Sequence, residues 1–154
     1  RDLHKEYRRQ RQMCIRDRYG SEKMNIAAVC GSFHKGEIER MLDFAKNEAS
    51  IRGAKISQII WVPGSMEVPL ALERILGDDE IDAAITLGII ERGETQHGLV
   101  MGQAVTKSII DLQIRHNKPI GLGIIGPGAE EHHIEPRLEP HARSAVNAVV
   151  EMSN

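Results

Sequence analysis

A carboxylate, a hydroxyl and an imidazole follow directly after a nearly apolar run of the chain. The run covers residues 81–90, Gly93 then permits a tight turn, and Glu94, Thr95 and His97 come next. Histidine, with an ordinary pKa of about 6.5, can take up or release a proton at neutral pH. The pattern predicts a buried strand that delivers these groups to its carboxyl end, where open α/β sheets bind ligands. We interpret His97 as a proton-transfer residue; the alternative is a surface histidine at a helix N-terminus.

Two further segments carry turn signals at the ends of predicted strands. VPGSMEVP covers residues 62–69 and GIIGPG covers residues 123–128. Taken alone, the first is an ordinary turn in which Glu67 supplies a favourable charge at a helix start, and the second is a plain loop. The GIIGPG segment has no lysine as in a phosphate-binding P-loop, and its glycines do not have the spacing of a dinucleotide fingerprint. Both observations argue against nucleotide hydrolysis.

The chain alternates between strand-like runs and helical stripes from residue 25 onward. This alternation predicts a flavodoxin-like α/β fold, a three-layer sandwich with a four-stranded parallel sheet between helices. The predicted strands cover residues 26–30, 55–62, 81–90 and 119–125, and the predicted helices cover residues 37–52, 67–76, 97–116 and 139–152.

The first 23 residues differ from the rest and are expected to be a disordered basic arm. They hold eight Lys or Arg and four Asp or Glu, which leaves 12 basic and 18 acidic residues of the chain's 20 and 22 in the body, residues 24–154. The string MCIRDR resembles translated sequencing-adapter DNA, so we expect this arm to be non-native and the native chain to begin at Met24. The alternative is a basic tail that binds an acidic surface.

Composition excludes several classes of protein. The mildly acidic body and the few aromatic residues argue against nucleic-acid binding. We see no signal peptide and no apolar run of membrane-spanning length. Cys14 and Cys30 do not form a disulfide framework, so a cytoplasmic location is expected. No metal is expected either, because the adjacent His132 and His133 cannot share a helix face.

Four segments, taken in order, resemble the lumazine synthases of riboflavin biosynthesis. They are Phe33-His34 after the first strand, VPGSMEVP after the second, LGIIERGETQH after the third and GLGIIGPG after the fourth. The combination of VPGSxEVP with GETxH at this separation is specific, and the resemblance covers residues 24–154. The GPG segment and the brief link to the last helix look most like archaeal members of the family.

The resemblance implies a transferase that needs no cofactor. Its small-molecule substrates are 5-amino-6-(D-ribitylamino)uracil and 3,4-dihydroxy-2-butanone 4-phosphate. An amine attacks the ketone to give an imine, phosphate leaves, and the ring closes with loss of water. His97 matches the proton-transfer histidine, Phe33 the aromatic residue that stacks on the pyrimidine, and Arg137 the arginine that pairs with phosphate. The other implied substrate-binding residues are His34, Ser65, Met66, Glu67, Ile89, Ile90, Glu91, Glu94, Thr95 and Leu122.

The family assembles as pentamers, some of which build icosahedral shells, so a pentamer or a multiple of pentamers is expected here. In that family the active site lies between subunits, and Leu122 and Arg137 would come from the neighbouring copy. Pro136 directly precedes Arg137, which leaves Arg143 as the alternative phosphate residue.

Three positions depart from the residues common in the family. In the family, asparagine is common at the position of His34 and an aromatic residue is common at the position of Met66. Phenylalanine is frequent at the position of Leu122, although archaeal relatives also lack it.

Two alternative functions remain on the same scaffold. One is the archaeal type of riboflavin synthase, which should lack the intact GETxH turn, and the other is a non-catalytic flavin-binding or shell protein.

Overall fold

The computed structural model describes residues 23–153, and within them a four-stranded parallel sheet forms the centre. The strands follow the order β2-β1-β3-β4, so the order reverses between β1 and β3. The elements are β1 Met24–Gly31, α2 Lys35–Ile51, β2 Ala54–Val62, η1 Ser65–Glu67, α3 Val68–Leu76, β3 Ala83–Glu91, α4 His97–His116, β4 Ile120–Ala129, α5 Glu131–Ile134, η2 Glu135–Arg137 and α6 Leu138–Ser153.

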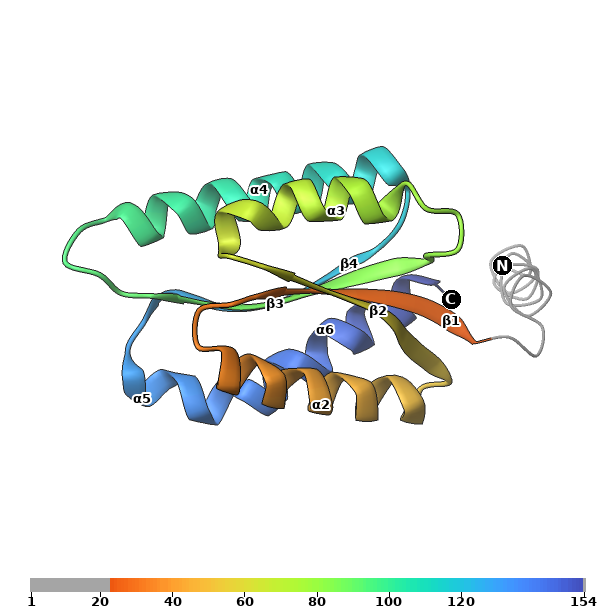
Figure 1. Ribbon diagram of the computed structural model, residues 1–154, viewed down its shortest axis with the longest axis horizontal. Helices are drawn as coiled ribbons and strands as arrows, with labels where there is room; N and C mark the ends of the chain where they lie inside the picture. Colours follow the sequence, from red (N-terminus) through yellow and green to blue (C-terminus); the bar gives the residue numbers. More distant parts are fainter. Residues whose placement is uncertain (1–22, 154) are drawn as a thin grey trace, which may run out of the picture.

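Helices cover both faces of the sheet, which confirms the predicted flavodoxin-like three-layer fold. Helices α3 and α4 lie on one face, and α2 and α6 lie on the other (Figure 1). Because all strands are parallel, their carboxyl ends meet at one edge of the sheet, on the left in Figure 1. The β1–α2, β2–α3, β3–α4 and β4–α5 connections therefore gather at that edge, where the sequence places its chemical groups.

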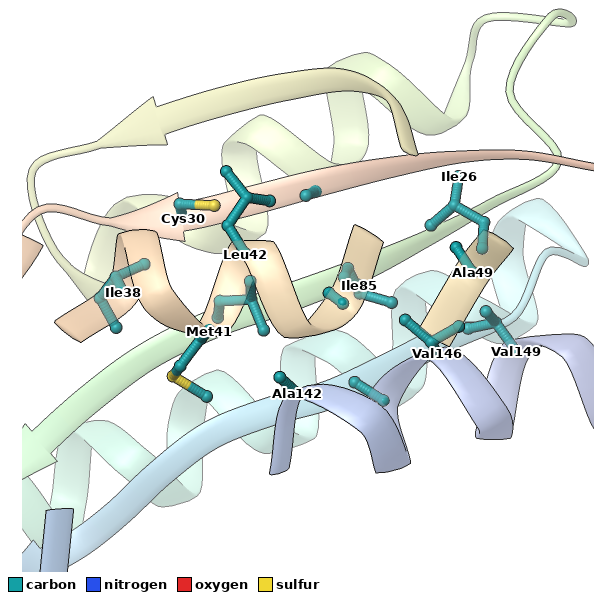
Figure 2. Packing of buried hydrophobic residues seen from close by; sticks show 14 of the residues in the cluster. Ile26, Cys30, Ile38, Met41, Leu42, Ala49, Ile85, Ala142, Val146 and Val149 are labelled. Atoms are coloured by element: carbon teal, nitrogen blue, oxygen red, sulfur yellow. The ribbon is translucent and has the colours of Figure 1, made fainter. Parts of the chain in front are cut away.

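Two apolar clusters hold the layers together. One joins β1 and β3 to α2 and α6, and Figure 2 shows its side chains, among them Ile26, Met41 and Val146, packed between the sheet and these two helices. The second joins the opposite face of the sheet to α3 and α4. Strand β3 is buried along its whole length except at its last residue, Glu91, as the continuous apolar run predicts. The rigid centre of the sheet therefore ends in a polar residue at the functional edge.

Two regions differ from the predicted elements. The GIIGPG segment was predicted to be a loop, but β4 continues through it to Ala129, although the β3–β4 register shifts between Ile89 and Glu91. A Cβ on Gly126 would lie 2.2 Å from the carbonyl oxygen of Ile90, so only glycine lets the two backbones approach this closely. The short helices α5 and η2 were not predicted, because four and three residues are too few for an apolar stripe to repeat along a helix.

The prediction for the basic arm falls, apart from Lys23, outside the described residues. Among residues 23–153, no helix combines the length and the apolar character needed to cross a membrane.

Candidate active site

The β1–α2 turn presents Phe33 at the functional edge. The amide and the hydroxyl of Ser32 both donate to the carbonyl oxygen of Val62, at 2.9 and 2.8 Å, and so fix the turn to the end of β2. The ring of Phe33 lies against Gly64, where an added Cβ would be 3.0 Å from its Cε2 atom. Phe33 is nevertheless 69% exposed, so one face of an aromatic ring is available to a planar ligand.

The β3–α4 connection places His97 at the first position of α4, as predicted. The backbone amide of His97 donates to the hydroxyl of Thr95 at 3.3 Å, which links the GETQH turn to the start of the helix. Gly98 lies close to the carbonyl oxygen of Glu91, since a Cβ there would approach it to 3.0 Å. Glycine at this position therefore lets α4 begin directly against the end of β3.

These two connections enclose a hollow that we call the central pocket. Its volume is about 330 Å³, near the lower end of the range for small-molecule sites. Most of the predicted site residues of the β1 and β3 ends lie on its wall, which confirms that the sheet edge brings them together in space. The lining residues are Phe33, His34, Ile89, Ile90, Glu91, Arg92, Gly93, Thr95, His97, Gly98 and Met101.

His97 also borders a second, apolar hollow of about 310 Å³ between α3 and α4. Met66 and Pro69 line this hollow from the β2–α3 side, so His97 lies between it and the central pocket. Met66 is 74% exposed although it is a large apolar residue. An imidazole between two hollows can reach reacting groups held on either side of it.

The remaining residues of the VPGSMEVP segment have separate roles in the structure. Ser65 is buried, and its hydroxyl lies 3.7 Å from where a Cβ on Gly88 would be. Glu67 accepts a hydrogen bond from the amide of Gly64 at 3.0 Å, which holds the turn after β2 closed. Glu67 also lines a hollow of about 460 Å³ beside the edge strand β2, away from the central pocket.

The turn before α4 borders a further hollow of about 420 Å³, which we call the loop pocket. Glu94 and Thr95 line it, together with Pro127 and Gly128 at the end of β4. The first amides of a long helix attract anions, so this hollow suits a phosphate group better than the apolar one. Arg92, which the sequence analysis did not single out, lines both the loop pocket and the central pocket.

Leu122 and Arg137 line none of these four hollows. Leu122 lies on the edge strand β4, opposite Thr86 in the ladder, and is 45% exposed. The guanidinium of Arg137 donates to the carbonyl oxygen of His133 at 3.1 Å. A single chain thus does not bring these two predicted residues together with Phe33 and His97.

The alternative phosphate residue, Arg143, is held by other groups. Its guanidinium lies 3.0 Å from the Glu48 carboxylate, donates to Asn47 at 2.9 Å, and stacks over the ring of Phe44. These contacts tie α6 to α2. Arg137 has no carboxylate partner among residues 23–153, so it is the better placed of the two arginines to take up an anion.

His141, in the first turns of α6, was missed by the sequence analysis. Partial burial and the positive charge of Arg137 lower the pKa of His141, while a hydrogen bond with the backbone of Ile124 opposes this effect. Its place beside Arg137 follows from their four-residue spacing across the η2–α6 junction, whereas its hydrogen bond with the backbone of Ile124 depends on how α6 packs against β4 and was invisible in the sequence.

His132 and His133 do come together with Glu130, and one ligand atom from each lies within 4.8 Å of the others. Nδ1 of His133 accepts a hydrogen bond from the Glu130 amide at 3.0 Å, which occupies that lone pair. The arrangement is an exposed helix start in which these groups stabilise one another.

Comparison with known proteins agrees with this geometry. The family model for 6,7-dimethyl-8-ribityllumazine synthase matches residues 23–154. The chain belongs to the 6,7-dimethyl-8-ribityllumazine synthase family. A relative of that name from Methanothermobacter thermautotrophicus is 39% identical over 85% of this chain and 94% of its own length. Relatives of the same name from Methanobrevibacter smithii and Metallosphaera sedula are 38% and 36% identical over 84% of this chain, and over 94% and 86% of their own lengths.

Membership of the lumazine synthase family confirms the resemblance that the four strand-end segments indicated. It also confirms the predicted enzyme class, a transferase of riboflavin biosynthesis, and does not favour the two alternative functions. The archaeal relatives agree with the archaeal character of the GPG segment.

Proposed function

We propose that this chain condenses 5-amino-6-(D-ribitylamino)uracil with 3,4-dihydroxy-2-butanone 4-phosphate to 6,7-dimethyl-8-ribityllumazine, with release of phosphate and water. The observation that carries the proposal is the central pocket, in which Phe33, the end of β3 and His97 share one wall. A flat heterocycle fits between an exposed aromatic ring and a strand end, and the reacting amine then lies within the reach of an imidazole.

His97 is proposed to move the protons of the reaction. The amine nitrogen attacks the ketone carbon, its proton is taken up, and water leaves as the imine forms. Loss of phosphate follows, and the second nitrogen closes the ring with loss of a further water. These steps deliver a proton to one atom and remove a proton from another, which an imidazole can do because either ring nitrogen can donate or accept a proton. Holding both substrates together supplies the rest of the rate enhancement.

The phosphate of the ketone is proposed to bind in the loop pocket. The backbone at the start of α4 offers N–H groups there, and Thr95 and Arg92 lie on its wall. The Glu94 carboxylate must then point away from the anion. The proposed reaction uses neither a metal nor an organic cofactor. The proposed substrate-binding residues are Phe33, His34, Ser65, Met66, Glu67, Ile89, Ile90, Glu91, Glu94, Thr95, Leu122 and Arg137.

We propose further that a second copy of the chain completes the site within a pentamer or a multiple of pentamers. Three proposed ligand-contacting residues, Phe33, Met66 and Leu122, are large apolar side chains that a single chain leaves between 45% and 74% exposed. A neighbour that brings Leu122 to the rim of the central pocket and Arg137 to the adjoining loop pocket would cover this surface and supply a cation for phosphate. The proposed location is the cytoplasm, and the buried free thiol of Cys30 fits a reducing compartment.

Mixing the two purified substrates with the protein tests the reaction. We expect the reaction to form inorganic phosphate and lumazine in equimolar amounts. A phosphate assay measures the first product and absorbance measures the second. Riboflavin formed from lumazine alone would show the riboflavin synthase activity instead, and ligand binding without any turnover would show a non-catalytic protein.

A further inference from the structure

Arg92 is the cation that one chain provides on the wall of the candidate active site. It lines both the loop pocket and the central pocket, and no other lysine or arginine of residues 23–153 lines either of them. The wall of the loop pocket also carries Glu91 and Glu94. A phosphate bound there would lie near two carboxylates, so its binding depends on a positive charge that reaches it from the same wall.

The sheet fixes the backbone of Arg92, while most of its side chain is exposed. The amide of Arg92 donates to the carbonyl oxygen of Ala129 at 2.8 Å, which ties the residue after β3 to the end of β4. The side chain is 70% exposed. Because an arginine side chain is long and flexible, its guanidinium can change partner here without any movement of the sheet.

The Glu130 carboxylate holds the guanidinium at the edge of the loop pocket. Nη1 of Arg92 donates to Oε1 of Glu130 at 3.2 Å. Glu130 lines neither pocket, whereas Gly128, two residues earlier, lines the loop pocket. By comparison, Arg40 donates to both carboxylate oxygens of Glu135, at 2.7 and 2.5 Å. The contact between Arg92 and Glu130 is thus a long hydrogen bond at the surface, and exposed pairs of this kind are weak.

A phosphate group can replace this carboxylate. A phosphate monoester carries about two negative charges at neutral pH, and its oxygens match the parallel N–H groups of a guanidinium. The Glu130 carboxylate is already 45% exposed, so water can solvate it once the guanidinium leaves. The arrangement therefore favours exchange of the carboxylate for a phosphate in the loop pocket.

We propose that Arg92 binds the phosphate of the ketone substrate, and that Glu130 competes with this phosphate for the guanidinium. The inference rests on the proposed function for the identity of the phosphorylated substrate. It adds a cation of the same chain to the substrate-binding residues, and it gives Glu130 a role in setting the affinity. Since Arg92 also lines the central pocket, a phosphate on its guanidinium keeps the ketone close to the proposed pyrimidine site.

Steady-state kinetics of Arg92→Ala, Arg92→Lys, Glu130→Gln and the Arg92→Ala/Glu130→Gln double variant test the proposal. Arg92→Ala should raise KM for the ketone phosphate roughly tenfold, the lower end for a hydrogen bond to a charged group, with little change in kcat. Arg92→Lys should give an intermediate KM, because lysine keeps the charge and loses the paired N–H groups. Glu130→Gln should lower KM by roughly two- to fivefold, because it removes the competing charge.

The double variant shows whether Glu130 acts through Arg92. Once residue 92 is alanine, Glu130→Gln should leave KM unchanged. The matched control is Glu151→Gln, which removes the charge of another exposed carboxylate, 2.7 Å from Arg52 and outside both pockets, and should not affect KM. An unchanged KM in Arg92→Ala, no gain in affinity from Glu130→Gln, or the same gain with and without Arg92 would overturn the proposal.

Titration with inorganic phosphate, followed by phosphorus NMR, provides a readout without turnover. Wild type should bind phosphate, Glu130→Gln should bind it more tightly, and Arg92→Ala should bind it more weakly. Absence of binding to wild type, or equal binding after Arg92→Ala, would overturn the proposal whether or not the protein turns over the substrates. The expected order of affinities without turnover in wild type would instead refute the proposed function alone.

Discussion

Gly64→Ala should separate the shape of the active site from the stability of the fold. Gly64 has φ −160° and ψ −175°, an extended conformation that alanine adopts without strain. An added Cβ would lie 3.0 Å from Cε2 and 3.4 Å from Cδ2 of Phe33, whereas carbon atoms prefer separations of roughly 3.5–4.0 Å. The ring must therefore move by a few tenths of an ångström or swing outward, which its exposure allows.

The expected change in stability is small because the exposed ring can yield. Replacing glycine in an allowed conformation also stabilises by about 0.4–1 kcal/mol through the unfolded state, so the free energy of unfolding should change by less than about 1 kcal/mol. The effect on binding should be larger. Aromatic stacking contributes about 0.5–1.5 kcal/mol beyond area burial, and its loss would raise KM for the pyrimidine by roughly two- to tenfold.

A double-mutant cycle decides whether the effect passes through the ring. Gly64→Ala should raise KM in the wild type and have no further effect in a Phe33→Ala background. Gly36→Ala is the matched control, because a Cβ there meets nothing within 4 Å. The reasoning fails if Gly64→Ala weakens pyrimidine binding equally with and without the aromatic ring, or if KM stays at the wild-type value in the folded variant.

Three other substitutions have defined outcomes. His97→Ala should lower turnover roughly ten- to a thousandfold while the circular dichroism stays native; full turnover would remove its proton-transfer role. Gly121→Ala should lower the free energy of unfolding by about 3 kcal/mol, because a Cβ there would lie 2.1 Å from the carbonyl oxygen of Ala145. This value is at the upper end for overpacking. An unchanged urea midpoint at equal protein concentration would contradict this packing. The lowered pKa of His141 means that the unfolded chain binds the proton more tightly, so stability should fall as pH drops from about 6.5 through the folded pKa. His141→Gln should flatten that part of the stability curve, and an unaltered slope in urea titrations would show that His141 does not cause it.

The sequence predicted the parts of the fold that follow from periodicity. Helix α4 has the predicted bounds because a long apolar stripe begins after the GETQ turn and ends at Asn117, which takes the left-handed conformation. Strand β3 was recognisable because a central parallel strand is apolar on both faces. These signals are local, so one sequence is enough to read them.

The parts that escaped prediction depend on contacts between distant segments. The GIIGPG segment looks like a loop on its own. It continues β4 because Gly123 and Gly126 lie close against β3 and because Gly102 of α4 leaves room for Pro127. The contact between His34 and Glu91 joins positions between which the chain forms α2, β2, η1 and α3. No spacing rule connects such residues, so only the three-dimensional structure shows that they meet.

The strongest consequence of the proposed assembly is that neither His97 nor Arg137 should be needed in every subunit. On one chain His97 lines the central pocket and Arg137 lies outside it, so in the proposed oligomer each site takes these residues from different copies. Protein that carries only His97→Ala, or only Arg137→Ala, should be slow at low concentrations of the ketone phosphate.

Co-expression of the two variants in equal amounts should restore activity, because random mixing gives about a quarter of the sites both intact residues. The mixed assemblies can be isolated by two different affinity tags, and a mixture of the separately purified variants serves as the control. If each chain instead formed a complete site by itself, the co-expressed assemblies would show only the average of the two variants. That outcome would refute the shared site, while leaving the proton-transfer role of His97 to its own test.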